Sequence, residues 1–99
     1  MVSCSVVTKD VLTNPVEIDI EEGLDFETAR LLADQKAITL ASRPMLLAWY
    51  DAASGRFSPN VTCCSEHKPG WLVYAESRGG NLTIDINDER YVFVYCDLE

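Results

Sequence analysis

The chain has 99 residues, of which 47% are hydrophobic and 24% are charged, and its formal net charge is −8. This length and composition predict one globular domain spanning 1–99 and argue against a disordered chain. The eight basic residues are scattered and no apolar run reaches the roughly 18 residues of a membrane span, so neither nucleic acid nor a membrane is expected as a partner.

The N-terminal segment has no basic start and no long apolar core, so we expect no secretory signal peptide. We therefore expect a cytoplasmic protein whose four cysteines are free thiols or metal ligands, not structural disulfides. Residues 1–12 show no clear pattern and are expected to be irregular. The pair at 98–99 resembles the remnant of a purification tag.

The next part of the chain predicts a strand and then a helix. Apolar residues alternate with acidic ones over 16–20, which is typical of a half-buried strand. Over 25–41, apolar residues recur at helical spacing after Asp25, which is a good N-cap residue. Pro44 disfavours helical geometry at the residue before it, so the helix is expected to end there.

The rest of the chain predicts β structure. Short turn signals, among them the Gly79-Gly80 pair, separate the apolar runs and indicate an antiparallel meander. The fold class is therefore α+β, with one amphipathic helix (about 25–41) packed on a four- to five-stranded, mainly antiparallel sheet. After the strand at 16–20, further strands are expected at 45–51, 71–76, 82–86 and 91–96.

The predicted sheet offers more apolar surface than one helix can cover. A helix of about 17 residues is about 25 Å long and shelters part of one face. The other face then needs a loop, a ligand or another subunit, and a homodimer or a protein partner is the simplest expectation. Aromatic residues anchor interfaces well, although each one is nearly as often an ordinary core residue. The candidate interface residues are Trp49, Trp71, Phe93 and Tyr95.

The segment 61–71 gathers the most reactive side chains, namely Cys63, Cys64, Glu66 and His67. Zinc favours cysteine and histidine, but adjacent residues on a strand point to opposite faces, so only a sharply turned loop would bring both thiols to one ion. In a redox reading, the two cysteines form a strained disulfide, or the histidine activates one thiol. The favoured interpretation is that these residues are structural, with one cysteine buried in the core and the histidine solvated. We therefore expect no cofactor, with zinc as the alternative.

Two weaker candidates remain. Arg78, Gly79 and Gly80 would present charge and bare backbone N–H groups to an anion, but paired glycines more often serve a hairpin turn. The acidic stretch 85–89 lacks the glycine-containing pattern of a calcium-binding loop. No serine nucleophile motif occurs, so an enzymatic role has no support from particular residues.

One long run of the chain resembles a known family. It reads Trp71-Leu-Val-Tyr-Ala-Glu-Ser-Arg-Gly-Gly-Asn-Leu-Thr-Ile-Asp-Ile-Asn-Asp88, and Ala48-Trp-Tyr-Asp51 and the cysteine pair precede it. This pattern is similar to a small bacterial and archaeal family of unknown function, and the similarity extends from about Asp25 onward. The resemblance implies a compact, stand-alone α+β domain and carries over no catalytic residue.

These observations favour a small cytoplasmic protein without enzymatic activity, which self-associates or binds a partner through an aromatic sheet face. The alternative is a thiol-redox or metal-binding protein that uses the loop containing Cys63, Cys64 and His67.

Overall fold

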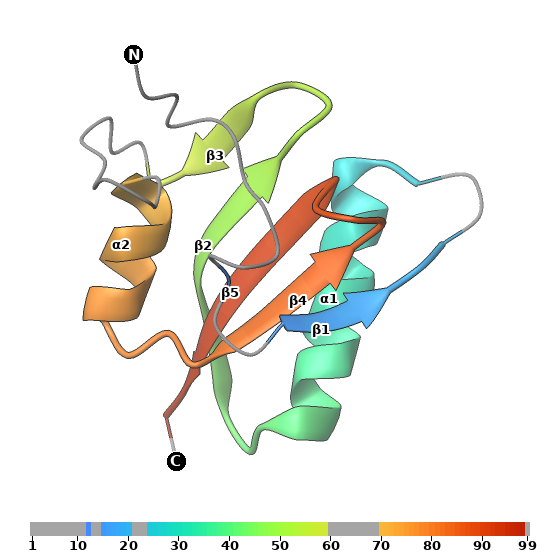
Figure 1. Cartoon of the computed structure of the whole chain (residues 1–99). Helices are drawn as coiled ribbons and strands as arrows, with labels where there is room; N and C mark the ends of the chain where they lie inside the picture. The colour runs from blue at the N-terminus through green and yellow to red at the C-terminus, as the bar shows by residue number, and fades with distance from the viewer. Residues whose placement is uncertain (1–11, 13–14, 21–23, 60–69, 99) are drawn as a thin grey trace.

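The computed structural model describes residues 12, 15–20, 24–59 and 70–98 (Figure 1). This part of the chain contains two helices and five strands. In order they are β1 (Pro15–Ile18), α1 (Phe26–Leu40), β2 (Pro44–Asp51), β3 (Arg56–Ser58), α2 (Gly70–Ser77), β4 (Leu82–Ile86) and β5 (Tyr91–Asp97).

All five strands belong to one sheet, in the order β1-β4-β5-β2-β3. β1 runs parallel to β4, whereas the other neighbouring pairs are antiparallel. The register between β2 and β5 shifts between Leu46 and Ala48, which places a bulge at Leu47. The expected α+β class with a mainly antiparallel sheet is confirmed.

Helix α1 forms where the sequence predicts it. The side chain of Asp25 accepts a 2.8 Å hydrogen bond from the backbone N–H of Thr28, and this bond holds the pKa of the aspartate below its ordinary value. Ala29, Ala33 and Ala37 are fully buried and form the stripe that faces the sheet. Because alanine side chains are small, the helix axis lies close to the strands beneath it.

The expected strand at 71–76 is wrong, because Gly70–Ser77 is the second helix, α2. Trp71, Leu72 and Ala75 are buried while Val73 is exposed, which is the pattern of one helix face and not of alternation along a strand. Aromatic and β-branched residues favour strands locally, but burial against the sheet outweighs that preference here.

The expected hairpin turn at Gly79-Gly80 is wrong as well, because these glycines end α2. The N–H of Gly79 donates to the carbonyl of Glu76 (3.1 Å), and the N–H of Gly80 donates to the carbonyl of Ala75 (2.9 Å). Gly79 has a φ of +89°, which is the left-handed conformation of a helix C-terminal glycine.

The two helices cover opposite faces of the sheet (Figure 1). Val92 and Val94 of β5 belong to one buried cluster with Trp71 and Leu72 of α2. The alternate residues of β5 belong to a second cluster with the alanines of α1; they are Tyr91, Phe93 and Tyr95. The second apolar face, which was expected to need a partner, is therefore covered in large part by α2 of the same chain.

Candidate functional site

The four aromatic candidates divide between the two cores. Trp71 and Phe93 are fully buried and Tyr95 is 2% exposed, so these three are closed to a partner in this conformation. Trp71 stacks on Tyr50 with ring centroids 5.6 Å apart and the planes within 5° of parallel. Trp49 is half-buried and contacts Phe26 of α1, at a centroid distance of 4.4 Å. The expectation of an open aromatic sheet face is corrected accordingly.

The thiol and metal candidates Cys63, Cys64, Glu66 and His67 lie outside the described residues. Cys96, on β5, is a buried free thiol. In the described ranges, no three His, Cys, Asp or Glu side chains lie close enough together to hold a metal ion.

The anion candidate at Arg78, Gly79 and Gly80 is also corrected by the structure. Both glycine N–H groups already donate to carbonyls of α2, so they are not directed at a ligand. The guanidinium of Arg78 lies over the ring of Tyr74, 4.9 Å from its centroid.

The acidic stretch 85–89 shapes the turn between β4 and β5. Asn87, Asp88 and Glu89 all have positive φ angles, an arrangement that needs local support in residues other than glycine. That support comes from Asp85, whose Oδ1 accepts a 2.6 Å hydrogen bond from the N–H of Glu89. The side chain of Asn87 bonds both the N–H and the carbonyl of Ile20, so this turn also holds the end of β1.

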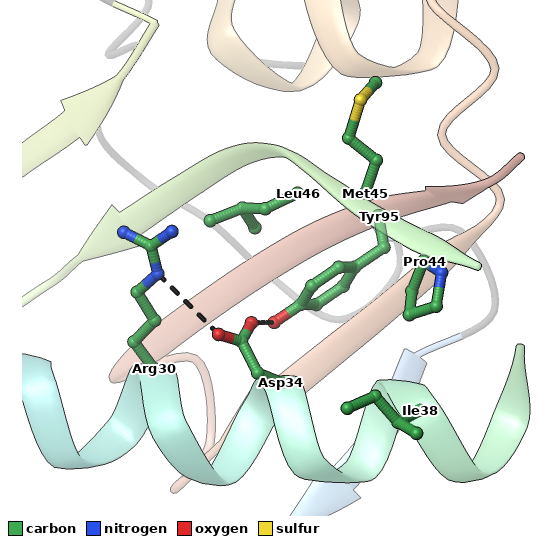
Figure 2. A pocket seen from close by; sticks show the side chains of 7 residues that line it. All are labelled: Arg30, Asp34, Ile38, Pro44, Met45, Leu46 and Tyr95. Carbon is green, nitrogen blue, oxygen red and sulfur yellow. Dashed lines mark hydrogen bonds and ion pairs between the residues drawn. The ribbon is translucent and has the colours of Figure 1, made fainter.

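A surface hollow of about 400 Å³ lies between α1 and β2, and we call it the α1–β2 groove. Figure 2 shows its wall of α1 side chains and the ring of Tyr95 in its base. The side chain of Met45 points away from this base (Figure 2). The lining residues are Arg30, Asp34, Ile38, Pro44, Met45, Leu46 and Tyr95.

The helix and the strand that form the groove run side by side in opposite directions. Phe26 contacts Trp49 at one end, and Ile38 and Pro44 lie together at the other (Figure 2). From Phe26 to Ile38 the helix rises about 18 Å, and from Pro44 to Trp49 a strand extends about 16 Å. The two lengths match, so Arg30, Asp34 and Ile38 follow the course of β2 at four-residue spacing.

A hydrogen bond of 2.6 Å joins the hydroxyl of Tyr95 to Oδ1 of Asp34. Burial raises the pKa of the Tyr95 hydroxyl far above its ordinary value, and the bond to Asp34 raises it further. The phenol therefore stays neutral and acts as the donor. Nε of Arg30 lies 3.9 Å from Oδ2 of the same carboxylate, which is too long for a hydrogen bond.

Among the described residues, part of the outer edge of β2 has no neighbouring strand beside this groove. β3 pairs only with Trp49, Tyr50 and Asp51, so within the described ranges Pro44–Ala48 have no strand on the side away from β5. Two features interrupt this edge, namely the proline at its start and the bulge at Leu47. Ile38, which is 66% exposed, stands on the helix side of the groove.

The groove is lined by apolar, charged and phenolic side chains. None of its seven lining residues is a serine, cysteine or histidine, and its one phenol donates to its one carboxylate. Sequence analysis named Tyr95 as a candidate but gave no role to the other lining residues, among them Arg30 and Asp34. The four-residue spacing of Phe26, Arg30, Asp34 and Ile38 was the available signal, but it does not reveal which strand lies alongside.

Comparisons with known proteins agree with the expected family. Residues 13–95 match the family model of DUF5619, which is described as a domain of unknown function. An uncharacterized protein of Archaeoglobus fulgidus is 37% identical over 78 residues, which cover 76% of this chain and 84% of that protein. The crystal structure of AF1514, from the same species, matches with a TM-score of 0.76 and 27% identity, over 89% of this chain and 98% of that one. Among the described residues, no helix is both long enough and apolar enough to cross a membrane.

Proposed function

Because the chain belongs to the DUF5619 family, whose domains are of unknown function, we propose its function from its geometry: it is a non-enzymatic module that binds an extended segment of a partner protein along the outer edge of β2. The observation that carries this proposal is the edge at Pro44–Ala48, which no strand of the described part of the chain pairs with, beside the α1–β2 groove. An added strand gains backbone hydrogen bonds from such an edge, and its alternate side chains enter the neighbouring groove.

The groove supplies the apolar contact that such a complex needs. Ile38 is 66% exposed and lies beside Pro44 at one end of the groove, and Leu46 lies further along β2 (Figure 2). Pro44 and Leu46 are both half-buried. The bulge at Leu47 keeps the regular part of the edge short, so backbone pairing alone would be brief. Most of the affinity would then come from side chains that fill the groove.

A different protein fits this edge better than a second copy of the chain. Two copies would each carry a net charge of −8, and this charge opposes their approach. A second copy of the chain is the competing occupant of the β2 edge, and light scattering at micromolar concentration tests for such self-association directly. The same proposal assigns the protein to the cytoplasm, where a free buried thiol such as Cys96 is the ordinary state of cysteine.

The test is a selection of random nine-residue peptides displayed on phage against the immobilised protein. Selected peptides are then measured by fluorescence anisotropy with Ile38→Glu and Leu31→Glu. These two residues are matched, since both lie on α1 and are 66% and 62% exposed, but only Ile38 lines the groove. We expect Ile38→Glu to weaken binding at least tenfold and Leu31→Glu to bind like the wild type. Equal affinities for the two variants, or no selected peptide at all, would overturn the proposal.

A further inference from the structure

The spacing along α1 matches the spacing of side chains along a strand. Ile38, Asp34 and Arg30 are four residues apart, which separates neighbours by about 6 Å along the helix axis. Side chains on one face of a strand repeat about every 6.6 Å. Since α1 runs alongside β2, a segment paired with the β2 edge would present its alternate side chains to these three residues in turn.

From this match, and resting on the proposed function, we propose that the groove selects an extended segment by three alternate side chains. In the bound segment, an acidic side chain contacts Arg30, a basic side chain contacts Asp34 and an apolar side chain contacts Ile38. Pro44 lies beside Ile38 at the apolar position, whereas Leu46 lies further along β2, toward Arg30 (Figure 2).

The charged positions have unused hydrogen-bonding capacity. The Arg30 side chain is 51% exposed, and its Nε is 3.9 Å from Asp34, beyond hydrogen-bonding distance. The guanidinium therefore retains its donors for a carboxylate of the bound segment. Asp34 uses Oδ1 to accept from Tyr95 and keeps lone pairs on both oxygens for an ammonium or guanidinium group.

The existing ion pair between Arg30 and Asp34 does not prevent the bound segment from pairing with these two residues. It is an exposed ion pair at four-residue spacing on one helix, which is a weak class of interaction. The bound segment would extend the pair into a longer row of alternating charges, from its own acidic residue through Arg30 and Asp34 to its own basic residue.

The direction of the segment follows from strand pairing. Antiparallel pairing is slightly more stable per residue than parallel pairing. Since β2 runs opposite to α1, an antiparallel partner runs in the same direction as α1. From its N-terminus, the expected order of groove-facing residues is therefore acidic, basic and apolar, with one outward-facing residue between each.

The test uses two fluorescein-labelled peptides of equal composition and equal net charge. The matched peptide is Thr-Glu-Thr-Lys-Thr-Ile-Thr, and the control exchanges the glutamate and the lysine. We expect the wild-type protein to bind the matched peptide about fivefold more tightly in fluorescence anisotropy. The double variant Arg30→Asp with Asp34→Arg should reverse this preference. Arg30→Glu, which keeps the Tyr95–Asp34 bond, should abolish it, and thermal unfolding confirms that each variant is folded.

The outcomes separate this inference from the proposed function. Equal binding of the two peptides, or unchanged preference in the charge-exchanged variant, overturns the order of side chains. If phage-selected peptides still depend on Ile38 in that case, the binding function itself stands. If binding of the phage-selected peptides does not depend on Ile38, both the binding function and the proposed order of side chains are contradicted.

Discussion

The hydroxyl of Tyr95 on β5 donates a 2.6 Å hydrogen bond to Oδ1 of Asp34 on α1, two residues that are 61 positions apart in the chain. This bond joins the helix to the sheet at the base of the α1–β2 groove. It also holds the carboxylate in the orientation that the proposed recognition of a basic side chain requires. The stability of the fold and the shape of the groove thus depend on the same contact.

Replacing Tyr95 with phenylalanine removes this bond and keeps the ring. We expect the free energy of unfolding to fall by about 1 kcal/mol, because the half-exposed carboxylate of Asp34 regains water when the phenol is lost. Urea denaturation measures the change. Tyr74→Phe is the control, since the ring of Tyr74 lies under Arg78 and keeps that contact without its hydroxyl. Equal losses in the two variants would show that the bond adds nothing.

The same phenol predicts a loss of stability at alkaline pH. Burial raises the pKa of Tyr95 in the folded state, so its contribution to stability is fully present below the unfolded pKa of about 10 and declines as the pH rises above it. We expect the free energy of unfolding to fall more steeply in the wild type than in Tyr95→Phe between about pH 9 and 11. Tyr50, whose pKa is also raised by burial, adds a background that both proteins share. Parallel curves would contradict this role of Tyr95.

The two glycines that end α2 predict unequal costs of substitution. Gly79→Ala adds a methyl group that meets nothing within 4 Å, so its cost of about 1 kcal/mol comes from the φ of +89° alone. In Gly80→Ala, the new Cβ would lie 2.8 Å from the Ala75 carbonyl oxygen and 2.9 Å from Cγ1 of Val94. We expect Gly80→Ala to cost more, about 2–3 kcal/mol, in urea denaturation. A smaller loss at Gly80 than at Gly79 would contradict this account.

The cysteines offer a direct check on the zinc and redox alternative. We expect Cys96, which is 7% exposed, to resist alkylation in the native protein and to react on unfolding, as read by mass spectrometry. In the favoured structural reading, added zinc leaves the alkylation of Cys63 and Cys64 unchanged. Zinc-dependent protection of both thiols that His67→Ala abolishes would instead support metal binding.

Local chemistry made α1 predictable. The Asp25 cap, the buried alanine stripe and the proline after the helix act within a few residues of one another, so they need no knowledge of the rest of the fold. β2, β4 and β5 were predictable because alternation and turn signals delimit them. The candidate site was not, because its polar residues look like an ordinary solvated helix face in the sequence.

The segment that forms α2 has a sequence pattern that does not distinguish a helix from a strand. Trp71, Leu72 and Val73 form a short apolar run, which suits a buried strand or a buried helix equally well. Gly79 and Gly80 resolve the choice only when they are understood as a helix C-terminus. With a strand predicted at 71–76, no second helix was available to cover the other face of the sheet. The expectation of an exposed aromatic surface followed from that prediction.

The amino-acid sequence by itself determined the α+β class, the positions of α1, β2, β4 and β5, and the excess of negative charge, because each depends on neighbouring residues or on composition. Only the tertiary structure decided that α2 covers the second face and that Tyr95 meets Asp34 beside the part of β2 that β3 does not pair with. These features depend on the order in which distant strands pair, and that order is set by the burial of both sheet faces together rather than by any local pattern.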